Sequence, residues 1–85
     1  MNNEIYIAKG KLAELQDTLN NIEIRADSLL IQIRELLNPA NDFFEFDTDL
    51  ILELVKLFRE LQLQAREIQE KIRKIKLSYN LWKTP

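Results

Sequence analysis

The chain has 85 residues, no cysteine, no histidine and a formal net charge of −2. These numbers exclude a disulfide framework, zinc sites of the usual type, and catalysis by thiolate or imidazole. They also exclude a uniformly basic nucleic-acid binder, although not a local basic patch. With one glycine and two prolines, the composition favours long helices in one small domain over residues 1–85.

The first residues, MNNEIYIAKGK, lack the basic start and the long apolar run of a signal peptide. No later stretch of the sequence approaches the length and hydrophobicity of a membrane span. The absence of cysteine is compatible with a reducing compartment. We therefore expect a cytoplasmic protein without a membrane partner.

The first predicted element is a helix over residues 3–38. Its apolar residues recur at spacings of three and four over five heptads, which is typical of a coiled-coil-like helix. Gly10 costs about 1 kcal/mol inside a helix, but the heptads run through it. Proline disfavours helical geometry at the residue before it, so Asn38-Pro39 ends the helix. The core positions are Ile5, Ala8, Leu12, Leu15, Leu19, Ile22, Ala26, Leu29, Ile33 and Leu36.

The predicted turn, residues 39–47, carries Phe43, Phe44 and Phe46 among polar side chains. These aromatic residues either fold back as a plug over the end of the helical core or form an exposed contact for a partner. We favour the plug, because the bare end of a helical core needs covering. Both interpretations hold in part if the core belongs to an oligomer.

The second predicted helix covers residues 48–81, and Asp47 or Thr48 can cap it. Its core residues match those of the first helix when residues whose numbers add up to 87 are paired, so that Leu29 meets Phe58. Each alanine then faces a larger residue, as an interdigitating core prefers. This shared register predicts an all-α fold, an antiparallel two-helix hairpin. The core positions are Ile51, Leu54, Phe58, Leu61, Ala65, Ile68, Ile72, Ile75, Tyr79 and Trp82.

Apolar residues outside the seam are concentrated in the half of the hairpin near the turn. They include Ile24, Ile31, Leu52 and Leu63, whereas the half near the termini offers only Ile7, Leu77 and Leu81. Self-association into a four-helix bundle or a larger helical oligomer would bury them, and we expect a dimer. The predicted interface consists of Leu30, Leu37, Phe43, Phe44, Phe46, Leu50, Val55 and Leu57.

The half near the termini is basic. Residues 1–18 and 69–85 hold seven basic and four acidic residues, whereas residues 19–68 hold five basic and ten acidic ones. Cations interleaved with aromatic side chains can bind phosphate and stack on a base. The structural alternative, which we favour, is that these lysines complement the helix dipole. The candidate anion or nucleotide patch is Tyr6, Lys9, Lys11, Lys71, Arg73, Lys74 and Lys76.

Catalysis has little support in the sequence. The carboxylates Asp42, Glu45, Asp47 and Asp49 lack the pattern of a calcium loop, and neither helix carries the Glu-x-x-His motif of di-metal bundles. We expect no enzyme, no cofactor and no metal. The leading hypothesis is a helical-hairpin interaction protein that self-associates and binds or blocks another macromolecule, as an adaptor, regulator or inhibitor. The alternative is nucleic-acid or nucleotide binding through the basic, aromatic end.

Overall fold

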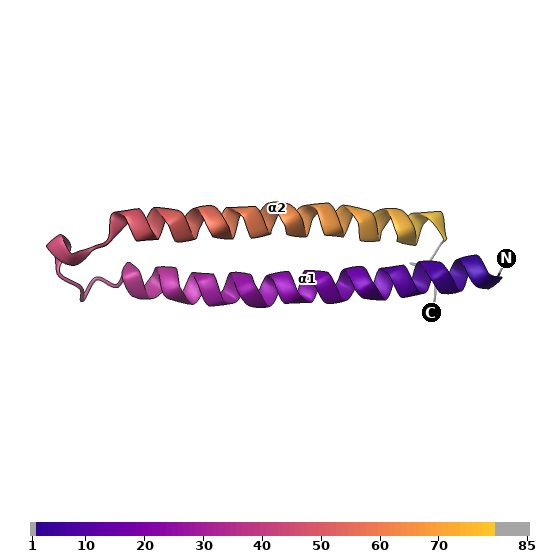
Figure 1. Cartoon of the computed structure of the whole chain (residues 1–85), viewed down its shortest axis with the longest axis horizontal. Helices are drawn as coiled ribbons and strands as arrows, with labels where there is room; N and C mark the ends of the chain where they lie inside the picture. Colours follow the sequence, from indigo (N-terminus) through magenta and orange to yellow (C-terminus); the bar gives the residue numbers. More distant parts are fainter. Residues whose placement is uncertain (1, 80–85) are drawn as a thin grey trace.

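The computed structural model describes residues 2–79 and shows a helical hairpin (Figure 1). Helix α1 spans Asn2–Leu36, a short 3₁₀ helix η1 spans Phe43–Glu45, and helix α2 spans Thr48–Ser78. The two long helices run side by side in opposite directions along a rod of 64 × 21 × 16 Å. The predicted antiparallel hairpin is therefore confirmed. Neither long helix contains a segment apolar enough to cross a membrane within these residues.

The seam between α1 and α2 contains the predicted heptad positions. The least exposed side chains, at 5–8% of their free surface, are Ala8, Leu15, Ile22, Ile33, Leu61 and Ile72. Ile5 and Tyr79, at the open end of the rod, remain exposed, and Trp82, the predicted partner of Ile5, lies outside the described residues. The other core positions are half-buried: Leu12, Leu19, Ala26, Leu29, Leu36, Ile51, Leu54, Phe58, Ala65, Ile68 and Ile75.

Two helices alone make a thin core. No side chain among those that the structure describes is completely enclosed, because each helix buries one stripe and leaves the rest of its circumference in water.

Helix α1 ends at Leu36, two residues earlier than predicted. Its last turn tightens, because the Asn38 N–H donates to the Glu35 carbonyl three residues back, at 3.3 Å. The Asn41 side-chain amide donates to the same carbonyl at 3.1 Å, which satisfies an acceptor that the helix end would leave unpaired. Asn38 then begins the turn, with its side-chain oxygen accepting the Ala40 N–H at 2.9 Å.

Helix α2 begins at Thr48, as predicted. Asp47 is its N-cap: the carboxylate accepts the Leu50 N–H at 3.0 Å, and the backbone carbonyl accepts the Ile51 N–H at 3.0 Å. Asp49 in the first turn adds a negative charge near the positive end of the helix dipole. At the other end, the Tyr79 N–H donates to the Ile75 carbonyl, and the predicted continuation to residue 81 lies outside the described residues.

Candidate functional site

The apolar side chains outside the seam lie on two edges of the hairpin. Each heptad has two core positions. In an antiparallel pair of helices, the residues directly before the first core position lie on one edge of the hairpin, and the residues directly after the second core position lie on the other edge. Leu50 and Leu57 lie on the first, which we call the groove edge. Leu30, Leu37 and Val55 lie on the second, which we call the opposite edge.

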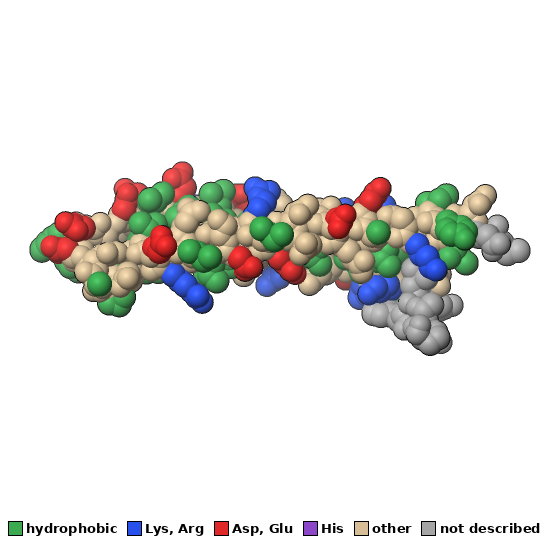
Figure 2. All heavy atoms as spheres, turned by 90° about the horizontal axis from the view of Figure 1, so that it is seen from below, with side chains coloured by type: hydrophobic (Ala, Val, Ile, Leu, Met, Phe, Trp, Pro, Cys, Tyr) green, Lys and Arg blue, Asp and Glu red, His purple; other side chains and the backbone are tan. Residues whose placement is uncertain are grey.

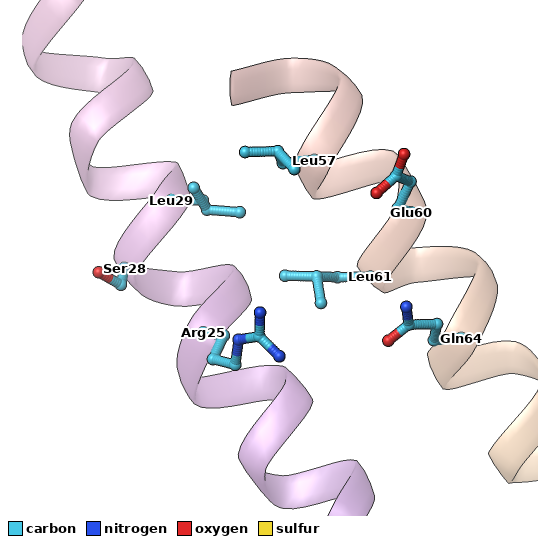
Figure 3. Close-up of a pocket in the computed structure, with 7 residues that line it drawn as sticks. All are labelled: Arg25, Ser28, Leu29, Leu57, Glu60, Leu61 and Gln64. Carbon is cyan, nitrogen blue, oxygen red and sulfur yellow. The ribbon is translucent and has the colours of Figure 1, made fainter. Parts of the chain in front are cut away.

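The groove edge is hollowed where α1 and α2 face each other. One hollow, of about 290 Å³, has the leucines Leu29, Leu57 and Leu61 as its floor, with Arg25, Ser28, Glu60 and Gln64 as polar lining. Figure 3 shows the three leucines pointing into the space between the helices, and Arg25 extending from α1 toward Gln64 of α2.

A second hollow, of about 260 Å³, continues along this edge toward the turn. It is lined by Gln32, Glu35, Leu36, Leu50 and Leu54. An open trough with an apolar floor and a polar rim accepts side chains from another helix, as in the knobs-into-holes packing of helical bundles. The rim residues on α1, from Arg25 to Glu35, are absent from the set predicted from sequence, although heptad register alone places them on one side of that helix.

The eight predicted interface residues are available for contact. Leu30 and Phe46 are half-buried, and the other six are exposed. Leu57 retains 45% of its surface and Leu50 retains 39%, which is high for leucine beside a helical seam. In the structure, the exposed leucines of the turn-proximal half thus lie along its two edges, with the seam between them.

The turn does not form the predicted plug over the core. Phe43 and Phe44 are 78% and 89% exposed, and only Phe46 is half-buried. The two exposed rings pack edge to face, with centroids 5.2 Å apart and planes at 84°.

The reason lies in the capping of η1. The Asp42 carboxylate accepts the Phe44 N–H at 3.2 Å, and the Asp42 carbonyl accepts the Glu45 N–H at 2.9 Å. These bonds fix a short helical turn whose aromatic side chains lie in solvent. Within residues 2–79, no cluster of acidic side chains has the arrangement of a metal site, and two of the turn carboxylates, Asp42 and Asp47, serve as caps.

Acidic side chains crowd the turn end of the rod, whereas basic ones lie further along it (Figure 2). The predicted anion patch divides between the two edges. By heptad register, Lys9 and Lys76 flank the seam on the opposite edge, whereas Lys11 and Lys71 flank it on the groove edge. The seam separates the two groups.

Part of the basic surface is already paired within the chain. Arg73 donates to both carboxylate oxygens of Glu70, with Nε 3.0 Å from Oε2. This hydrogen bond, helped by the charges of Arg73 and Lys74, lowers the pKa of Glu70, and it raises the pKa of Arg73. The Nζ of Lys11 lies 3.9 Å from the Glu14 carboxylate.

Comparison with known protein families, curated proteins and solved structures gives no significant match for this chain.

Proposed function

We propose that this chain is a small non-catalytic interaction protein that self-associates through its turn-proximal half and binds or blocks another macromolecule. One observation carries the proposal. The seam encloses no described side chain completely, yet the turn-proximal half still exposes Leu37, Leu50, Val55 and Leu57 beside that seam. Roughly half of the surface of each of these side chains stays outside the two-helix core, and contacts along the two edges of the hairpin would bury it.

The magnitudes are adequate for association. Fully burying a leucine-sized side chain is worth roughly 1.5–3 kcal/mol, so a half-exposed one gains about 1 kcal/mol. A dimer buries such side chains, and the leucines beneath them, from two copies at once, which brings the gain to the order of the association cost of roughly 4–15 kcal/mol.

The turn supplies a contact for the other macromolecule. Phe43 and Phe44 form an exposed aromatic pair on a backbone that Asp42 and Asp47 hold by hydrogen bonds. Aromatic side chains dominate binding energies when a partner buries them, and a preorganised backbone reduces the entropy lost on binding. The lack of histidine and cysteine supports a binding role over a catalytic one.

Analytical ultracentrifugation over a range of concentrations tests the self-association. The wild-type chain should sediment as a dimer, and Leu30→Glu/Leu57→Glu should sediment as a smaller species, because it charges both edges. The matched variant Ile7→Glu/Leu77→Glu adds the same charges to the half near the termini and should leave the mass unchanged. A wild-type monomer at high micromolar concentration would refute self-association.

The charge separation along the rod keeps nucleic-acid or nucleotide binding as the alternative function. Phosphate contacts weaken steeply with added salt, whereas a leucine-rich contact does not. Binding of a single-stranded oligonucleotide at low salt that is lost in the Lys9→Gln/Lys74→Gln/Lys76→Gln variant, with helicity intact, would favour the alternative. No binding at low salt would remove it.

A further inference from the structure

The charge distribution along the rod disfavours a parallel dimer. Residues 19–68 hold ten acidic and five basic side chains, and Figure 2 shows the acidic ones concentrated toward the turn. In a parallel dimer the two turns coincide, which brings together two copies of Asp42, Glu45, Asp47 and Asp49. Antiparallel copies separate the two turns and bring each one toward the basic part of the other copy, which is the complementary arrangement.

The rim of the groove edge is complementary to itself when it is reversed. Along α1 the rim reads Arg25, Ser28, Gln32 and Glu35. In an antiparallel two-fold pair whose axis passes beside Leu57, α1 packs on α1, so Arg25 faces Glu35 of the second copy. Ser28 then faces Gln32 of the second copy, and each contact occurs twice.

The hollows of this edge fit the same arrangement. Leu57 meets its own equivalent at the axis, and Leu50 reaches the hollow that Leu57, Leu61 and Gln64 line in the other copy. One contact is unfavourable, because Glu53 comes opposite Glu60 of the second copy. Both glutamates are exposed, so solvent and salt weaken their repulsion.

We infer that a second copy of the chain packs antiparallel on the groove edge, in the register that pairs Arg25 of each copy with Glu35 of the other. This inference rests on the proposed self-association, and it specifies which edge of the hairpin is in contact and how the two copies are oriented. The opposite edge, with Leu30, Leu37 and Val55, stays outside this contact, as does the Phe43–Phe44 pair.

Spin labels measure the direction of the pair. The chain has no cysteine, so one introduced cysteine carries the only label. For Ala40→Cys in the turn, the inferred register predicts labels about 30 Å apart, from a rise of 1.5 Å per residue on either side of the axis. A parallel dimer predicts less than about 20 Å, because the turns are then one helix-packing distance apart.

A second label separates the two proposals. Lys56→Cys lies level with the axis, so its labels should be within about 20 Å in the antiparallel register, and within about 30 Å across the diagonal of a parallel dimer. Absence of coupling between the Lys56→Cys labels would refute self-association itself. Coupling there, combined with Ala40→Cys labels closer than about 20 Å or further apart than about 45 Å, would overturn the antiparallel register alone.

Charge exchange tests the paired residues. Arg25→Glu should weaken the dimer roughly tenfold, because two attractive contacts become repulsive. Arg25→Glu/Glu35→Arg should restore the affinity. Glu60→Arg alone should strengthen the antiparallel dimer, because it removes the repulsion with Glu53 of the second copy. In a parallel dimer α1 packs on α2, so Arg25 faces Glu60 and Glu60→Arg should weaken the dimer instead. Lys56→Glu, which alters net charge equally away from the groove edge, should have little effect.

Discussion

The two halves of the hairpin bury the same seam but differ on their edges. Near the termini, Ala8 and Ile72 are as buried as Ile33 and Leu61 are nearer the turn. The edges of the terminal half are basic, whereas those of the turn-proximal half carry exposed leucine and valine side chains. Because the seam is buried in both halves, the difference between them lies in the residues outside it.

The two ends of the rod also differ in what holds them in place. At the turn, Asn38, Asp42 and Asp47 each accept a backbone N–H through the side chain, so the loop is held without burying its phenylalanines. At the other end, Ile5 and Tyr79 occupy core positions but remain exposed. Hydrogen bonds order the turn end, and apolar packing orders the rod between the two ends.

The largest expected effect is on the seam in the turn-proximal half. Leu61→Ala should lower the free energy of unfolding by roughly 2–5 kcal/mol. Leu61 is buried in the seam, so its removal leaves a cavity between the two helices in addition to the lost apolar contacts. The control Leu63→Ala changes a leucine with 47% exposure on the same helix and should cost less than about 1 kcal/mol. Urea unfolding followed by circular dichroism measures both. If the two variants lost the same free energy of unfolding, the assignment of Leu61 to the seam and Leu63 to the surface would be contradicted.

A smaller effect, of opposite sign, is expected near the termini. Gly10 lies within α1, and a methyl group added there meets no atom within 4 Å. Gly10→Ala should therefore raise the free energy of unfolding by about 0.5–1 kcal/mol, because alanine restricts the unfolded chain and favours the helix. The reverse change at a nearby exposed position, Ala13→Gly, should lower it by a similar amount. Destabilisation by Gly10→Ala would indicate that this end of α1 has another contact.

The heptads made the hairpin predictable, because one register explains both helices and their pairing. The outward position of Phe43 and Phe44 was not predictable from hydrophobicity, since it depends on which N–H groups the Asp42 oxygens accept. The hollows were also missed, because they depend on how closely particular side chains such as Leu29 and Leu57 fill the space between the helices. The Arg73–Glu70 pair follows a local spacing of three residues and was within reach of the sequence.

The turn itself should tolerate loss of its aromatic side chains. Phe43→Ala/Phe44→Ala should change the free energy of unfolding by less than about 0.5 kcal/mol, because exposed side chains contribute little to the folded state. The half-buried Phe46→Ala is the matched control and should cost more. Thermal unfolding at low protein concentration measures both variants. A large loss from the Phe43/Phe44 change would mean that these rings are buried after all, as in the plug.

The smallest expected effect concerns the exposed ion pair on α2, in the half near the termini. The hydrogen bond from Arg73 lowers the pKa of Glu70 in the folded chain, so the ionised carboxylate favours folding. This contribution is present above the ordinary pKa that Glu70 has in the unfolded chain, and it is lost as the pH falls through the lower folded-state value. Because both groups are in solvent, the contribution is small and falls with added salt.

The variant Glu70→Gln should therefore be slightly less stable than the wild-type chain at pH 7, and the difference should disappear in acid. Glu67→Gln on the same helix removes the same charge and leaves the Arg73 pair in place. Urea unfolding at intervals from pH 7 to pH 3 measures both variants. If the Glu70→Gln difference persisted at the acid end, the pair would act through packing of the arginine stem, which snorkels along apolar surface. If it were absent at every pH, the terminal half would depend on its seam alone.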